Sequence, residues 1–203
     1  MGDVEQVDGD KPCPIQNEQS IGRRLTLALV PWLVGACLAC GYWWPLLQGA
    51  GFIGGDVYNY FFPLKHFYAQ GLAEGELRHW HPGIGNGIPT VGESQTGVFY
   101  PFYAIAYRFL DLNTAYNTVF LVHYVLAFVF TYWLARALGM GMLASLWAAL
   151  VFVYGWFPPR ACLEWAIVTG SWMPLAVLAT IRWLRTPRVR WAWLIAGVFL
   201  LQL

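Results

Sequence analysis

Residues 113–138 read NTAYNTVFLVHYVLAFVFTYWLARAL, and Arg136, close to the end of the run, is their only formally charged side chain. A helix needs about 20 largely apolar residues to cross the hydrocarbon core of a bilayer. This stretch has that length and predicts a membrane-spanning helix. The whole chain is 58% hydrophobic and 11% charged, whereas soluble domains carry about 25% charged residues. The composition therefore excludes an ordinary soluble domain.

Other parts of the chain have the same apolar character, and we expect further spans at residues 25–47, 142–157, 165–184 and 191–203. The last of these runs into the end of the sequence, which indicates a span interrupted by truncation. Residues 1–24 are acidic and rich in Gln, Pro and Gly, a composition typical of a disordered tail. The expected fold class is all-α: a polytopic transmembrane helix bundle over 25–203, with a large first loop at 48–112, called here the loop segment.

The basic residues predict the orientation, because Lys and Arg accumulate on the cytoplasmic side of a membrane. With a cytoplasmic N-terminus, four basic residues fall outside and eight of the 12 fall inside, namely Lys11, Arg23, Arg24, Arg136, Arg182, Arg185, Arg188 and Arg190. The basic run 182–190 is explained as a membrane anchor, so no nucleic-acid partner is expected. No acid falls in the middle of a span, which argues against a proton relay through the membrane.

The loop segment is long and has a structure of its own to predict. Residues 57–71 are aromatic and amphipathic, as in a helix lying at a membrane surface, and residues 99–110 indicate a second such helix. The stretch between them, 78–97, is dense in Gly and Pro and predicts specific turns. Loops of this length in compact proteins are usually functional, so we expect the chemistry of the protein here.

Asp56 is the sharpest candidate for chemistry in the loop segment. It follows Gly54 and Gly55, whose backbone freedom lets a ligand approach closely. A carboxylate at the outer mouth of the first span can closely approach a bound headgroup or a metal. It can equally be the N-cap of the helix that begins at Val57.

Two histidines suggest a metal site. His79 and His81 flank Trp80, which puts both on one face of an extended segment, and with Asp56 or Glu93 they would form a ligand set for a divalent ion. The alternative is that both are interfacial side chains.

Other residues of the loop segment have the chemistry of a substrate site. Glu93 and Gln95 lie in a polar patch among turns, where they either bind a hydroxylated ligand or face solvent. Lys65 and His66 are candidates for contact with phosphate, with lipid headgroups as the alternative. Aromatic rings suited to stacking on sugars, or to a membrane interface, are supplied by Tyr58, Tyr60, Trp80, Tyr100 and Tyr103.

An ordered series of motifs in this segment resembles the first outer loop of bacterial YfhO-like membrane proteins, which belong to the GT-C superfamily of polyprenyl-phosphate-dependent glycosyltransferases. The series is Gly55-Asp56, Tyr60, Pro63, Gly75, Trp80-x-Pro82, Gly85-x-Gly87-x-Pro89 and Phe99-Tyr100-Pro101. Trp172-x-Pro174-Leu175 inside a later span also looks like that family.

The resemblance implies an enzyme of the bacterial cytoplasmic membrane that moves a sugar from a lipid-linked phosphate donor to a cell-envelope acceptor on the outer face. It implies that Asp56 is the catalytic base or helps to hold a divalent cation such as Mg²⁺ or Mn²⁺. The loop segment lacks a paired Asp-x-Asp or Glu-x-Asp motif, so metal dependence stays open. A transporter or flippase of lipid-linked sugars and a non-catalytic membrane scaffold are the alternatives.

Overall fold

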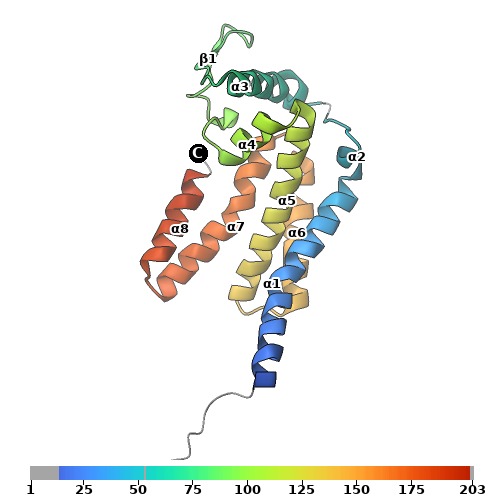
Figure 1. Cartoon of the computed structure of the whole chain (residues 1–203), viewed down its shortest axis with the longest axis vertical. Coiled ribbons are helices and arrows are strands. Elements are labelled where there is room, and N and C mark those ends of the chain that lie inside the picture. The colour runs from blue at the N-terminus through green and yellow to red at the C-terminus, as the bar shows by residue number, and fades with distance from the viewer. Residues whose placement is uncertain (1–13, 53, 202–203) are drawn as a thin grey trace, which may run out of the picture.

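The computed structural model of the protein describes residues 14–52 and 54–201, and this part of the chain is mostly helical. Long helices lie side by side in Figure 1, and α5 contacts three of them, α1, α6 and α7, while α8 packs against α7. The bounds of these helices are Pro14–Tyr42 for α1, Leu112–Ala137 for α5, Met142–Trp156 for α6, Glu164–Arg185 for α7 and Val189–Leu200 for α8.

Three helical segments among the described residues are long and apolar enough to cross a membrane. They are Leu112–Ala137, Met142–Arg160 (α6 with the short 3-10 turn η3, Pro158–Arg160) and Glu164–Arg185. The spans predicted at 113–138, 142–157 and 165–184 agree with these helices. The apolar part of α1, Ala28–Tyr42, and helix α8 are shorter.

Two ends of the predicted spans differ from the structure. Helix α1 already begins at Pro14, so residues 14–24 are helical and not a disordered tail. Pro is well tolerated in a first helical turn, and the Gln, Glu and Arg that follow are good helix formers. At its other end α1 stops at Tyr42, and the short helix α2 (Trp44–Leu47) follows as a separate turn. The rest of the predicted tail, 1–13, lies outside the described residues, as do 202 and 203 of the last predicted span.

Helix α5 is the centre of the bundle because one of its faces is an unbroken aromatic stripe. Every fourth residue of this stripe is a large ring with at most 1% of its surface exposed, namely Tyr116, Phe120, Tyr124, Phe128 and Tyr132. Residues four apart lie on the same side of a helix. The four rings from Phe120 onward pack against apolar residues of α1 and α6 in one core cluster, and Tyr116 packs with Val57 and Phe61 of the loop segment.

The loop segment folds over one end of the bundle, called here the loop end, where α5 and α7 begin. Helix α3 (Phe62–Glu74) lies across this end, transverse to the long helices in Figure 1, and α4 (Pro101–Phe109) leads toward α5. The two surface helices predicted at 57–71 and 99–110 are therefore present. Between them a small antiparallel pair, β1 (Trp80–His81) and β2 (Ile88–Pro89), departs from a purely α-helical chain.

Helix α3 ends at a glycine for a clear reason. Gly75 has a left-handed backbone (φ 75°), which costs an L side chain energy and suits Gly. The N–H of Gly75 donates to the carbonyl of Leu72 at 3.2 Å, and that of Glu76 donates to Gly71 at 2.8 Å. This bonding satisfies the last carbonyls of the helix and turns the chain toward the β pair.

Asparagines of α5 fasten the start of the loop segment to the bundle. The Asn117 side-chain amide donates to the carbonyls of Leu46 (3.2 Å) and Ala50 (2.8 Å), and that of Asn113 donates to Gly49 at 2.9 Å. The chain that leads to Asp56 is therefore held by a buried span in addition to its own turns.

Candidate functional site

Lys65 is the charged residue at the centre of the loop end. It belongs to the face of η1 (Val57–Phe61, a π-helical turn) and α3 that points into the bundle. The other buried residues of these two elements are Val57, Phe61, Leu64, Tyr68 and Gly71. Residues three, four and seven apart share one face of a helix. The apolar spacing therefore carries the lysine into the interior, where it is 0% exposed.

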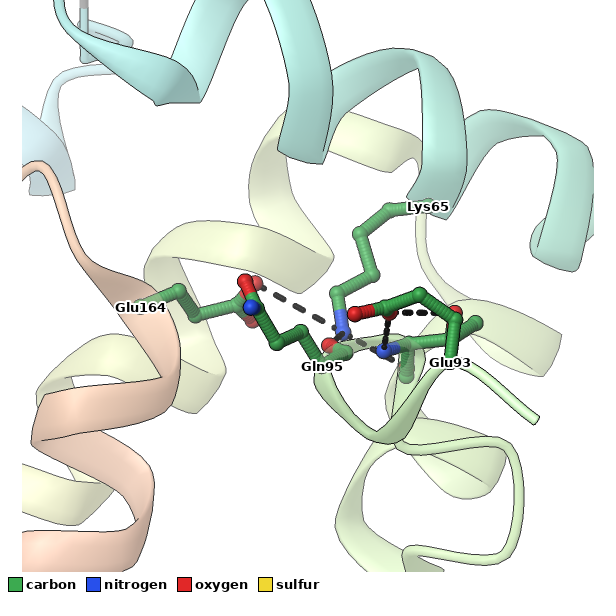
Figure 2. A network of polar contacts seen from close by, with 5 residues as sticks. Lys65, Glu93, Gln95 and Glu164 are labelled. Atoms are coloured by element: carbon green, nitrogen blue, oxygen red, sulfur yellow. Dashed lines mark hydrogen bonds and ion pairs between the residues drawn. The ribbon is translucent and has the colours of Figure 1, made fainter. Parts of the chain in front are cut away.

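The Lys65 ammonium has a complete set of neighbours in place of water (Figure 2). It donates to the carbonyl of Thr96 at 2.8 Å, lies 3.5 Å from that of Gln95, and is 3.6 Å from Oε2 of Glu164. It also lies over the Tyr103 ring, 3.4 Å from the centroid, which is a cation–π contact. One side chain thus connects α3, the turn at Gln95–Thr96, α4 and α7.

The ion pair between Lys65 and Glu164 is fully desolvated, since the two side chains are 0% and 2% exposed. Burial lowers the pKa of Lys65 to about 8, against the opposing effect of the nearby Glu164 carboxylate. Removing water from a charge costs several kcal/mol, so each member needs the other to remain buried.

Tyrosine hydroxyls surround the same carboxylate. Burial, reinforced by the neighbouring Glu164, raises the pKa of both Tyr103 and Tyr107 well above the ordinary value. Within the described chain, the hydroxyls of Tyr107 and Tyr116 and both oxygens of Glu164 are buried without a hydrogen-bond partner. Such groups are uncommon in folded proteins; the hydroxyls of Tyr124 and Tyr132, farther along α5, are also buried without a partner.

Glu93 shapes the turn that receives the lysine. Its carboxylate accepts from the Thr96 N–H at 2.8 Å and from the Thr96 hydroxyl at 3.1 Å, which caps the 3-10 turn η2 (Ser94–Thr96). Partial burial and the nearby Glu93 carboxylate raise the pKa of Tyr60. The structure thus brings together four predicted site residues, Tyr60, Lys65, Glu93 and Gln95.

Tyr100, another predicted site residue, belongs to a neighbouring buried group. Its hydroxyl lies 2.5 Å from Nε2 of His123 and accepts from the indole N–H of Trp172 at 2.9 Å, while Nδ1 of His123 lies 2.6 Å from the Val119 carbonyl. An Nδ1–H that donates to this carbonyl leaves Nε2 to accept from Tyr100. The group ties the start of α4 to α5 and α7 and leaves none of these atoms open to a ligand.

Asp56 lies at the surface of the loop end. It precedes η1 in the N-cap position, but its own backbone is helical (φ −77°, ψ −10°) and its side chain makes no capping hydrogen bond. A side chain caps well from an extended backbone, which explains the missing bond. A Cβ at the preceding Gly55 would lie 3.0 Å from Cβ of Cys162, so the backbone that leads into the exposed Asp56 packs against the segment before Glu164.

The two histidines considered as metal ligands are used differently. His81 is buried, its ring packs on Phe67 with centroids 4.3 Å apart, and its Nδ1 accepts from the N–H of Gly83 at 3.0 Å. His79 is exposed. No group of three His, Cys, Asp or Glu side chains in residues 14–52 and 54–201 is arranged to hold a metal. These donors do not fit a divalent ion, and we derive no step through one.

Two further predicted residues lie elsewhere on the loop segment. Trp80 is 55% exposed on the β pair, and its ring closes over Gly87, where a Cβ would come within 2.4 Å of the indole nitrogen. His66 is exposed on α3, with its Nε2 at 2.9 Å from the Gln70 amide nitrogen.

Glu164 is the main site residue that the sequence did not single out. A signal for it existed, because Lys65 shares the buried helical face of Val57, Phe61 and Leu64 and therefore needs a buried anion as partner. No local feature of the sequence identifies which acid pairs with Lys65.

Comparisons with protein-family models, with curated proteins and with solved structures find no significant match to this chain.

Proposed function

We propose that this protein is a membrane-embedded transferase of the bacterial cytoplasmic membrane. It moves a sugar from a polyprenyl-phosphate donor to a cell-envelope acceptor on the outer face. In this proposal the N-terminus is cytoplasmic and the loop end is extracytoplasmic. The observation that carries it is Asp56, an exposed carboxylate without a capping bond, whose neighbour Gly55 packs against the segment that leads into the buried Glu164.

The scaffold around Asp56 supports this role. A catalytic group acts best when rigid elements fix its position. Asp56 stands between two anchored segments: residues 46–50, which Asn117 bonds to α5, and α3, which Lys65 bonds to the interior. A loop held this way presents a carboxylate in one place without burying it.

The chemistry is a substitution at the anomeric carbon of the donor. Asp56 accepts the proton of an acceptor hydroxyl while the oxygen of that hydroxyl forms a bond to the anomeric carbon. The bond between the anomeric carbon and the phosphate oxygen breaks, and its electron pair leaves with the polyprenyl phosphate. Asp56 ends protonated and returns the proton to water.

The leaving phosphate needs positive charge nearby. Arg160 is suited to supply it, since it lies two positions before Cys162, the residue against which Gly55 packs. Its guanidinium is half-buried over the Trp156 ring at 4.4 Å and donates to the Trp156 carbonyl at 2.8 Å. An arginine fixed in this way retains further N–H groups for an anion.

A transporter of lipid-linked sugars is the competing proposal. It requires ligand-binding groups within broken spans. Pro174 lies inside α7, which is continuous from Glu164 to Arg185, and the buried polar group around His123 is bonded internally. The proposal of a transferase is therefore the better supported of the two.

Asp56→Asn is the decisive test of the proposed function. The purified chain in liposomes is supplied with polyprenyl-phosphate sugar and envelope glycan, and transfer of radiolabelled sugar is measured. Losing a general base lowers the rate by about 10²- to 10⁴-fold, and we expect a loss in this range. Activity within twofold of the wild type would remove Asp56 from the mechanism.

The matched control is Glu76→Gln, which neutralises another exposed acid of the loop segment and should leave transfer unchanged. Movement of the labelled lipid across the liposome membrane is measured in parallel. Movement of the donor across the membrane without any transfer product would favour the transporter.

A further inference from the structure

The exposed face of η1 and α3 carries a shallow, open hollow, one side of which is formed by the turn that follows Asp56. The hollow has a volume of about 460 Å³ and is lined by Tyr58, Asn59, Phe62, Pro63, His66 and Leu112. Small-ligand sites range over about 300–1,000 Å³, so its size suits one or two sugar rings. Asp56 immediately precedes the helical turn that supplies Tyr58 and Asn59.

The exposed face begins at the π-helical turn η1. The N–H of Phe62 donates to the carbonyl of Val57, five residues earlier, and this wider turn continues directly into α3. Wide turns of this kind are rare and frequently occur at functional sites. Here the turn leaves Tyr58 68% exposed, although it lies next to the buried Val57.

The polar side of the hollow has a defined hydrogen-bonding pattern. The Arg78 guanidinium donates to Oε1 of Gln70 at 3.1 Å and lies 2.5 Å from Oε2 of Glu74. The Gln70 oxygen is therefore engaged, and its amide N–H donates to Nε2 of His66 at 2.9 Å. In this arrangement the ring nitrogen that carries the proton is Nδ1, which remains available as a donor.

Asn59 adds a second polar group. Its side-chain amide is exposed and makes no hydrogen bond within the described chain, so it offers both donors and an acceptor. The hollow thus combines aromatic surface from Tyr58 and Phe62 with two polar groups at one edge.

From these observations we propose that the hollow binds a pyranose ring of the acceptor, which is therefore a hexose-containing glycan. A pyranose has an apolar C–H face that packs on aromatic surface and hydroxyls that pair with an amide and an imidazole. A phosphate or phospholipid headgroup fits less well, because none of the lining residues is Lys or Arg and His66 accepts a hydrogen bond at Nε2. This inference rests on the proposed function, since Asp56 at the same helix start would receive the proton of the bound sugar hydroxyl.

Binding is measured separately from transfer. The full chain in detergent micelles is titrated with methyl hexopyranosides and hexose disaccharides, followed by saturation-transfer NMR, with glycerol phosphate and nucleosides as competitors. We expect Tyr58→Ala to weaken sugar binding about tenfold through loss of ring stacking. Tyr58→Phe should retain it, and Asn59→Ala should weaken it several-fold.

The matched control is Phe109→Ala, which removes another exposed ring, 79% exposed on α4, and should leave binding unchanged. Each variant alters an exposed side chain, and circular dichroism confirms that the helices remain. Absence of saccharide binding, equal binding by Tyr58→Ala and wild type, or displacement by glycerol phosphate or nucleosides rather than by other sugars would each overturn the inference.

The two proposals fail in different ways. Sugar binding that depends on Tyr58, combined with no transfer from any polyprenyl donor, would retain the binding site and remove the transferase. Transfer that depends on Asp56 but is unaffected by Tyr58→Ala would retain the transferase and remove this site. If both hold, Asp56→Asn binds sugar normally and does not transfer it.

Discussion

Replacing Lys65 by Met tests whether the charged network at the loop end holds the protein together. Methionine is close to lysine in length but leaves the carboxylate of Glu164 buried without its counter-ion. The two side chains are 0% and 2% exposed, which puts the pair in the desolvated class, where removing one partner costs about 3–5 kcal/mol. Loss of the bond to the Thr96 carbonyl acts in the same direction. We expect Lys65→Met to lower the free energy of unfolding by at least about 3 kcal/mol.

The assay is denaturant unfolding in detergent micelles, followed by tryptophan fluorescence. The double variant Lys65→Met/Glu164→Leu removes both charges and should recover most of the loss, because a desolvated pair can often be replaced by apolar residues at little cost. Arg108→Met is the control, since Arg108 is an exposed cation that bonds only backbone carbonyls of α3, and it should cost about 1 kcal/mol or less. A cost for Lys65→Met as small as this control, typical of exposed pairs, would refute the reasoning.

Two further outcomes are expected. The Lys65 pKa is about 8 in the folded protein against 10.5 ordinarily, so between these pH values the unfolded state binds more protons than the folded state. The free energy of unfolding of the wild type should therefore rise with pH in this range, by up to about 1.4 kcal/mol per unit relative to Lys65→Met. A parallel pH dependence of the two proteins would contradict this. Gly97→Ala should cost about 1–3 kcal/mol more than Gly85→Ala in the same unfolding assay. Both glycines have positive φ, but only at Gly97 would a Cβ meet the Tyr103 ring, at 2.5 Å. Equal losses would show that the ring moves freely.

Much of the bundle followed from the sequence, because length and apolar composition alone identify a spanning helix. The predicted spans 113–138, 142–157 and 165–184 agree with α5, α6 and α7. The surface helices were also predictable, since their apolar periodicity is local information. The start of α1 was not, because Gln, Pro and charged residues are typical both of a disordered tail and of an exposed helical end.

The candidate site was predicted only in part, and the reason is physical. Lys65, Glu93 and Gln95 stand out as polar residues in an apolar or turn-rich setting, and the structure brings them together. Glu164 becomes a site residue only because α3 crosses the end of the bundle, which is a contact between segments far apart in the chain. The role of His81 could not be predicted because its bond to Gly83 depends on the exact local turn, although the two residues are close in sequence.

The distribution of charge explains why chemistry is expected at the loop end rather than inside the bundle. A buried carboxylate is costly unless a cation accompanies it, and Lys65 reaches Glu164 only where α3 lies across the start of α7. Deeper in the bundle, His123 is bonded on both ring nitrogens, so it offers a passing ligand neither a free donor nor a free acceptor. The proposed transfer needs an available carboxylate and is therefore best located where Asp56 meets water, while the buried Lys65–Glu164 pair holds the following helix α3 in place.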